Sequence, residues 1–262
     1  MLELARINSE PQATATWSHS EPEGLVVGLA RTQQELEAVQ KFRYDVFTHE
    51  MDVVFPNAHN GVDADHYDAW CEHVMVNELG TGRVVGTYRL LTPQNARRAG
   101  GYYSEAEFEL SPLDHLRDQL FELGRSCTHP DYRNGSVILL LWSGIARIVQ
   151  QHGGRYVLGC ASVSLRDGGA SAAKVWRQVA ASMAEAAGAG LPQVAPLHRY
   201  PVECLDEGLP ARVPPLIKGY LKVGARICGE PAWDPDFNTA DFPVLLDVEN
   251  LDPRYRRHFG LV

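Results

Sequence analysis

Residues 122–130 read ELGRSCTHP and lead through DYRNG into the apolar run SVILLLWSGIARIV at residues 136–149. The run is long enough for a buried helix, and Gly153 and Gly154 mark its end. The stretch before it places a carboxylate, a guanidinium, a hydroxyl, a thiol and an imidazole among strand-like neighbours. We therefore expect a strand that ends in a chemically reactive segment, followed by a helix that covers the sheet.

Gly124 decides how this strand presents its side chains. Strict alternation places Glu122 and Ser126 on one face and Arg125 on the other. Glycine inside a strand often marks a bulge, and a bulge near Gly124 would let Glu122 and Arg125 share a face. It would also aim a backbone N–H into a cleft, where an oxyanion could accept from it. The alternative is a buried Glu–Arg pair that only fixes the sheet, and spacing alone leaves both open.

The rest of the chain alternates strands and helices. Hydrophobic patterns predict strands at 24–30, 71–78, 82–91, 155–163, 226–234 and 242–248, and helices at 32–51, 170–187 and 214–225. Thr32 and Glu35 form a capping-box signature at the first helix. Residues 92–101 are expected as a hinge-like loop, and residues 102–118 as short helical pieces. This order predicts one α/β domain with a mixed sheet over 23–262, after a flexible tail at 1–22.

Composition limits the class of protein. The chain has 262 residues, 45% of them hydrophobic, and a net charge of -9, which disfavours nucleic-acid binding. We find no apolar stretch long enough to span a bilayer and no signal-peptide pattern at the N-terminus. Five cysteines without a C-x-x-C pair favour reduced thiols. We therefore expect a cytoplasmic protein.

Metal binding is not expected from the spacing of the candidate ligands. The acidic loop DADHYD at residues 63–68 lacks the central glycine and distal glutamate of a calcium loop. His59, His66, Cys71 and His73 have no standard zinc spacing. The carboxylates of the loop could instead hold a substrate amino group, or they could form a solvated turn.

The combined pattern resembles a known family. The blocks that carry the resemblance are FRYDVF, DADHYDAWCEHVMV, VVGTYRLL, YYSEAEFEL, FELGRSCTHPDYRNGSVILLLWSGIARIV, LGCASV, PPLIKGYLKVGARICGEPAWDPDFNTADF and RYRRHF. Together they look like the bacterial ornithine N-acyltransferases of the GNAT superfamily, which make lyso-ornithine lipid from acyl carrier protein thioesters. The resemblance covers roughly residues 38–259 and extends more thinly to the acyl-homoserine lactone synthases.

This resemblance implies a fold and a set of site residues. It implies a mostly antiparallel sheet flanked by helices and splayed between its fourth and fifth strands, where the acyl chain would enter. Carried over by motif, the residues that shape the acceptor cleft are Arg43, Phe47, Asp68, Arg89, Glu122 and Arg125. We expect Glu122, Arg125 and Ser126 to act in catalysis, and we add Phe108 to the substrate-binding set.

One departure from the superfamily bears on the acyl donor. Acetyl-CoA enzymes of this superfamily carry a Q/R-x-x-G-x-G/A loop for pyrophosphate, of which only Arg133 and Gly135 remain here. A carrier-protein arm brings a single phosphodiester, so the reduced loop favours acyl carrier protein as co-substrate, with no bound cofactor. We expect Arg133, Asn134, Gly135 and Arg147 to contact the carrier protein or its phosphopantetheine.

Several alternatives stay open. The acceptor could be another amino acid or S-adenosylmethionine, as in lactone synthases. The chain could be a silent module that docks on carrier protein or membrane, or it could be a coenzyme A acetyltransferase. Peripheral membrane contact is plausible because the implied product is a lipid.

Overall fold

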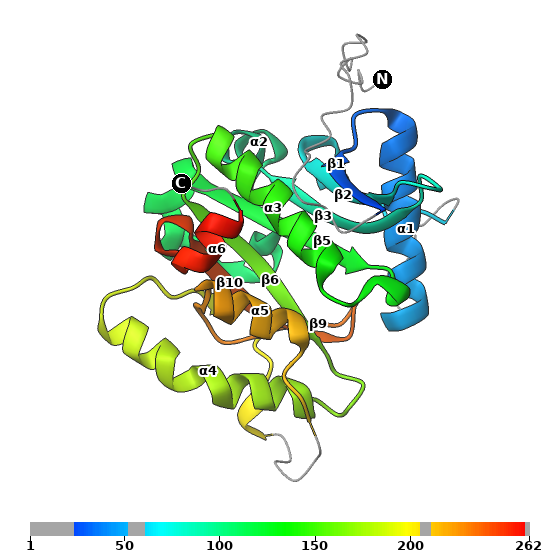
Figure 1. Ribbon diagram of the computed structural model, residues 1–262. Helices are drawn as coiled ribbons and strands as arrows, with labels where there is room; N and C mark the ends of the chain where they lie inside the picture. Colours follow the sequence, from blue (N-terminus) through cyan, green and yellow to red (C-terminus); the bar gives the residue numbers. More distant parts are fainter. Residues whose placement is uncertain (1–23, 52–60, 205–210, 260–262) are drawn as a thin grey trace.

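One mixed sheet organises the protein (Figure 1). The computed structural model describes residues 24–51, 61–204 and 211–259, so the tail expected at 1–22 lies outside the described residues. The sheet order is β1-β2-β3-β5-β6-β10-β8, with β9 paired to β10. The bounds are β1 Leu25–Leu29, β2 Glu72–Glu78, β3 Val84–Leu91, β5 Leu120–Thr128, β6 Tyr156–Ser164, β8 Arg226–Ile227, β9 Ala232–Asp234 and β10 Thr239–Asp247. A separate two-stranded ladder joins β4 Phe108–Glu109 to β7 Ala195–Pro196.

Helices cover both faces of this sheet. They are α1 Gln33–Met51, α2 Pro93–Ala99, α3 Ser136–Gln151, α4 Ala170–Gly188, α5 Pro215–Val223 and α6 Pro253–His258. Short 3₁₀ segments are η1 His66–Trp70, η2 Tyr103–Ala106, η3 Ser111–Gln119, η4 Pro130–Tyr132, η5 Val202–Cys204 and η6 Val248–Asn250. The capping box at α1 is confirmed, because the Glu35 amide donates to the Thr32 hydroxyl at 3.2 Å and the Thr32 amide donates to the Glu35 carboxylate at 3.0 Å.

The expectation of a hinge-like loop at 92–101 is wrong, because this segment contains α2. Thr92 caps the helix by accepting from the Asn95 amide at 3.2 Å, and Pro93 occupies its first turn. Gly100 ends it in the left-handed region at φ 94°. The cap, the proline and the glycine are together a helix signature, which the arginine and glycine content obscured.

The splay expected between the fourth and fifth strands of the sheet is confirmed between β5 and β6. Leu120 to Leu123 pair in parallel with Tyr156 to Gly159, and no pairing follows although both strands continue. At the last pair the backbones approach closely, since a Cβ on Gly159 would lie 2.9 Å from the Leu123 carbonyl oxygen. Beyond this point β5 and β6 part and leave a gap in the sheet.

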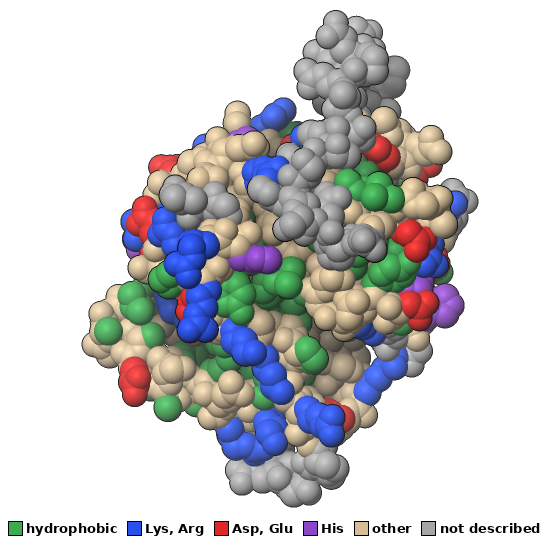
Figure 2. Space-filling view, in the orientation of Figure 1, with side chains coloured by type: hydrophobic (Ala, Val, Ile, Leu, Met, Phe, Trp, Pro, Cys, Tyr) green, Lys and Arg blue, Asp and Glu red, His purple; other side chains and the backbone are tan. Residues whose placement is uncertain are grey.

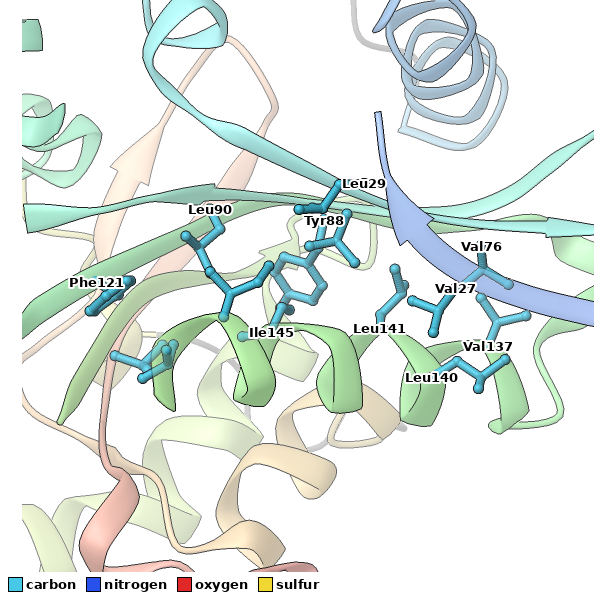
Figure 3. Close-up of a cluster of buried hydrophobic side chains, with 14 of the residues drawn as sticks. Val27, Leu29, Val76, Tyr88, Leu90, Phe121, Val137, Leu140, Leu141 and Ile145 are labelled. Atoms are coloured by element: carbon cyan, nitrogen blue, oxygen red, sulfur yellow. The ribbon is translucent and has the colours of Figure 1, made fainter. Parts of the chain in front are cut away.

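Side chains alternate between the two faces of the sheet, and a different helix packs against each face. On the α3 face, Leu90 and Phe121 of the sheet and Val137 of α3 are fully buried in one apolar cluster, as Figure 3 illustrates. On the opposite face, here the α1 face, Val39 and Phe47 of α1 pack against β2 and β3. Within the described residues, no helix is sufficiently long and apolar to cross a membrane.

Candidate active site

A cavity of about 290 Å³ lies at the gap between β5 and β6 and is lined from both faces of the sheet. Its polar wall lies on the α1 face and includes Arg89, Glu122 and Asp241. Its apolar wall lies on the α3 face and includes Trp142, Ala146, Ile217, Tyr220, Leu246 and Leu251 from α3, α5, β10 and the segment before α6. One end therefore suits polar and charged groups, and the other suits a hydrocarbon chain.

A bulge in β5 lies at the polar end of this cavity. Thr87 pairs with Cys127 and Arg89 pairs with Gly124, so residues 125 and 126 both oppose Tyr88. Arg125 adopts φ 51°, a left-handed conformation that is uncommon outside glycine. The expected bulge is confirmed, but its strained residue is Arg125 rather than Gly124. A Cβ at Gly124 would meet no atom within 4 Å.

The bulge turns Arg125 onto the α1 face, where Glu122 also lies. Its Nη2 lies 3.2 Å from Asp65 and its Nε 3.3 Å from Asp63. Its Nη1 donates to the Tyr103 hydroxyl at 3.4 Å. The alternative of a buried Glu122–Arg125 pair that only fixes the sheet does not hold. Arg125 forms its ion pairs with Asp63 and Asp65 instead. Its side chain is 13% exposed and lines the cavity.

Glu122 is 4% exposed and holds the start of η2. One carboxylate oxygen accepts from the Ser104 amide at 2.8 Å and the Ser104 hydroxyl at 2.6 Å. The other accepts from the Tyr103 amide at 2.7 Å. Burial raises the pKa of Glu122, while these hydrogen bonds favour the ionised form. A cavity-lining carboxylate with a raised pKa is suited to accept a proton near neutral pH.

Arg43 and Asp68, both expected to contact substrate, form a buried ion network behind the cavity wall. The Arg43 Nε lies 2.8 Å from Asp63, and its Nη2 lies 3.0 Å from both oxygens of Asp68. Arg89 reaches Asp65 at 2.6 Å and Asp68 at 3.4 Å. Burial opposes ionisation, but Arg43 and Arg89 hold the pKa of Asp68 below its ordinary value. Asp68 is paired with arginines and does not line the cavity, so its expected contact with a substrate amino group stays a prediction.

The other expected substrate-binding residues separate into two groups. Phe47 and Arg89 line the cavity, and so does Ser126, expected in catalysis. Phe108 does not, because it is 1% exposed in an apolar cluster with Leu113 and Leu158. The expected contact of Phe108 with substrate therefore stays a prediction, and the cavity lining does not include this residue.

Three of the residues expected at a carrier-protein contact lie just before α3, the fourth lies in the second half of that helix, and none of them lines the cavity. Arg133 is exposed and donates to the Thr128 carbonyl at 3.1 Å. The Asn134 side chain accepts from the Ser136 amide at 3.0 Å, and Gly135 precedes the helix in the left-handed region. Arg147 lies three turns along α3 and is half-buried. Their surface position is compatible with contact to a macromolecule.

Sequence patterns missed a second acidic group at the cavity. Glu107, Cys160 and Asp241 bring their side-chain ligand atoms within 4.8 Å of one another, from the segment before β4, from β6 and from β10. Cys160 and Asp241 line the cavity. Burial and the two carboxylates raise the pKa of the Cys160 thiol well above its ordinary value, which makes it a poor nucleophile.

Comparisons with known proteins identify the family of this chain. Residues 42–143 match the family model of the acetyltransferase (GNAT) domain. The L-ornithine N(alpha)-acyltransferases of Agrobacterium fabrum and Rhodobacter capsulatus are each 34% identical to the chain, over 250 and 249 residues. The matches cover 90% and 91% of this chain and 85% and 95% of those relatives. The chain belongs to the L-ornithine N(alpha)-acyltransferase family. It is an acyltransferase with a GNAT domain.

Solved structures of other acyl-transferring enzymes share the fold of this family member. FeeM, an N-acyl amino acid synthase from uncultured soil microbes, superposes with a TM-score of 0.53 at 10% identity, covering 89% of this chain and 94% of FeeM. The acyl-homoserine lactone synthase LasI gives a TM-score of 0.51 at 13% identity, covering 90% and 94%. At these identities the likeness concerns the fold alone, and it confirms the expected GNAT-like architecture.

Proposed function

We propose that this protein transfers a 3-hydroxy fatty acyl group from acyl carrier protein to the α-amine of L-ornithine, giving lyso-ornithine lipid. The observation that carries the proposal is the cavity at the gap between β5 and β6. It offers a carboxylate and arginines on one face of the sheet and hydrocarbon side chains on the other. Family membership supports ornithine as the acceptor, because the curated relatives are named for it.

In the proposed reaction the neutral α-amine attacks the thioester carbonyl. A C–N bond forms, the C–S bond breaks, and the phosphopantetheine sulfur leaves as a thiolate that receives, by way of Glu122, the proton lost by the amine. Glu122 takes the amine proton, directly or through water. For an α-amine of pKa about 8, deprotonation at pH 7 costs about 1.4 kcal/mol. A modest base is therefore sufficient.

Orientation of the reactants and stabilisation of the oxyanion lower the activation barrier by more than deprotonation of the amine costs. Holding amine and thioester together can supply about 7 to 11 kcal/mol, and one well-placed donor to the oxyanion about 3 to 4 kcal/mol. We assign the donors to the backbone amides of Gly124–Ser126, because the bulge places this segment on the cavity wall. Ser126 adds a hydroxyl close to the same position.

Arg125 is suited to hold the ornithine carboxylate. It lines the cavity beside Glu122, and its side chain is 13% exposed, so part of the guanidinium faces the cavity. Arg89 is 4% exposed and is fixed by Asp65 and Asp68, which makes it a rigid positive wall. Arg43 positions Asp63 and Asp68 from behind and does not itself contact substrate in this proposal.

The donor would approach from the surface at the start of α3. Arg133, Asn134, Gly135 and Arg147 would contact acyl carrier protein or its phosphopantetheine, since carrier proteins are acidic and exposed cations attract them. Figure 2 shows Lys and Arg side chains gathered over α5 and α6, beside apolar side chains. Lys218, Lys222, Arg254 and Arg257 are the exposed cations of these two helices. This second surface supports peripheral contact with anionic lipid near the apolar end of the cavity.

The test is mass spectrometry of products from purified protein, 3-hydroxyacyl carrier protein and an equimolar mixture of amino acids, with 3-hydroxyacyl-CoA as a parallel donor. We expect N-acylornithine, formed faster from the carrier protein. Acylation of another amino acid in place of ornithine would show that the proposed acceptor is wrong. Equal rates of acyl transfer from acyl-CoA and from acyl carrier protein would show that the enzyme does not prefer the carrier protein. The absence of any acylated product would favour the alternative of a docking module without activity.

A further inference from the structure

The second acidic group combines carboxylates without a cationic partner, although Asp241 is buried and Glu107 and Cys160 are half-buried. Glu107 and Asp241 lie with Cys160 so that their ligand atoms are within 4.8 Å of one another, and Asp234 of β9 lies nearby on the cavity wall. Asp241 is 3% exposed. In the described part of the chain, no lysine, arginine or histidine forms an ion pair with any of these three carboxylates, whereas Asp63, Asp65 and Asp68 are all paired.

The two carboxyl groups hydrogen-bond each other, and Cys160 and Ser162 each add a bond to the pair, but one oxygen is left without a donor. The Thr239 hydroxyl donates to one oxygen of Asp241 at 2.7 Å. The Oε2 of Glu107 is buried and has no hydrogen-bond partner. A buried, unsatisfied carboxylate oxygen is costly unless a donor occupies the site. Burial first, and then the neighbouring carboxylates, raise the pKa of Glu107. A cation placed between Glu107 and Asp241 would relieve both penalties.

The group is linked to the proposed base by two successive contacts through Ser104. Glu122 accepts from the Ser104 hydroxyl at 2.6 Å, and that hydroxyl lies 3.3 Å from the Cys160 sulfur. Cys160 in turn lies within 4.8 Å of the two carboxylates. In extended ornithine five bonds of about 1.5 Å separate the two nitrogens, which places them about 6 Å apart. An α-amine beside Glu122 therefore leaves the side-chain amine within reach of Asp241, which lines the cavity, and of Glu107 behind it.

We propose that Glu107 and Asp241 bind the side-chain ammonium of the acceptor and thereby select a basic amino acid. The inference rests on the proposed function, because it takes the acceptor amine to lie beside Glu122. A neutral acceptor would leave the acid pair buried without a donor, which is the condition under which polar sites discriminate most strongly. A shorter or longer side chain would misplace the ammonium relative to the pair.

The chemistry of the group favours an ammonium over a metal ion. A metal would use the Cys160 thiolate, and burial beside two carboxylates disfavours that thiolate. An ammonium needs acceptors only, and the two carboxylates supply them. Asp234 adds negative potential on the same wall without joining the three-atom cluster.

The experiment compares ornithine with 2-aminopentanoic acid, which has the same carbon chain without the terminal amine. Acyl transfer from one 3-hydroxyacyl carrier protein is measured for the wild type, Glu107→Gln, Asp241→Asn and the control Glu109→Gln, which is exposed two residues away. We expect the wild type to favour ornithine by at least about 100-fold in kcat/KM. Each site variant should lose about 10- to 100-fold with ornithine, keep its activity with 2-aminopentanoic acid, and remain folded by thermal unfolding. Glu109→Gln should match the wild type.

Three results would overturn the inference. One is equal kcat/KM for the two acceptors in the wild type, which also decides the matter if the variants do not fold. Another is a parallel loss with both acceptors in folded variants. A third is a stoichiometric metal in the purified wild type, by elemental analysis, that is absent from Glu107→Gln. Failure of the proposed function would look different, since the wild type would then acylate neither acceptor.

Discussion

Ser104 donates two hydrogen bonds to a single oxygen of Glu122, from its amide at 2.8 Å and from its hydroxyl at 2.6 Å. This pairing fixes the carboxylate at the polar end of the cavity and ties η2 to β5. It also bears on the protonation state of Glu122, because burial raises its pKa and both Ser104 bonds oppose the rise. The strand carboxylate is thus held in place by a turn that precedes it in the sequence.

Glu122→Gln tests the base. The amide keeps the size of the side chain but cannot accept a proton, so turnover should fall by about 10² to 10⁴. Single-turnover acyl transfer from 3-hydroxyacyl carrier protein to ornithine measures this. Glu105→Gln, which removes the partner of Arg117 at the half-exposed end of η2, is the matched control and should stay near the wild type. Near-normal turnover in Glu122→Gln would show that Glu122 is not the general base.

Ser104→Ala tests how the pKa of Glu122 is set. Loss of the hydroxyl removes a bond that favours the ionised carboxylate, so the pKa of Glu122 rises further. Because the base acts in its ionised form, the acid limb of the kcat/KM profile should move to higher pH by roughly one unit. Ser143→Ala on α3, whose hydroxyl donates to the Leu139 carbonyl, should leave the limb in place. An unmoved limb in Ser104→Ala would argue against Glu122 as the titrating group.

The pairing of half-buried Glu107 with buried Asp241 predicts a pH-dependent stability. Burial and neighbouring carboxylates raise the pKa of Glu107 to about 9 in the folded protein, against about 4.3 when unfolded. The folded state therefore binds this proton more tightly, and the associated stability is present below the unfolded value and lost as pH rises toward 9.

Glu107→Gln cannot ionise and should escape this loss. The difference in unfolding temperature, variant minus wild type, should increase steadily from about pH 5 to about pH 9 without ornithine. Glu109→Gln is the control, since the pKa of Glu109 is lowered by its bond to Ser111 and contributes no loss in this range. A difference that stays constant with pH would contradict a raised pKa for Glu107.

Arg133→Glu tests the carrier-protein surface. Reversal of this exposed charge should raise KM for the acyl carrier protein by about tenfold at low salt and leave KM for ornithine unchanged. The effect should shrink as salt screens the attraction. Lys222→Glu on α5 is the matched reversal on the other cationic surface. If Lys222→Glu raises KM and Arg133→Glu does not, the carrier protein docks over α5 and α6 instead.

Local rules predicted much of the framework. The Thr32 and Glu35 cap, the hairpin of β2 and β3 and the apolar helix α3 all follow from residues close together in the sequence. The bulge in β5 was predicted from a glycine in a strand. Its strained residue is nevertheless Arg125, because two aspartates hold that side chain on the α1 face.

Long-range pairing accounts for what the sequence could not predict. Arg43 and Asp68 were assigned to substrate by motif, but their mutual contact depends on how α1 packs against η1. Glu107 and Asp241 are separated by more than half of the chain and meet only because β4 and β10 lie on the same side of the cavity. Both lie in blocks that carry the family resemblance, but those blocks are far apart in the sequence, so no local signal pairs the two carboxylates.

A crystal structure with the product N-(3-hydroxyacyl)-ornithine would show whether acceptor and acyl chain occupy opposite faces of the sheet. We expect the amide to lie at the β5 bulge beside Glu122, with the ornithine side chain toward Glu107 and Asp241 on the α1 face. The hydrocarbon tail should pass the gap between β5 and β6 and lie against Trp142 and Ala146 of α3. A product bound outside this gap, or a tail lying on the α1 face, would contradict this arrangement.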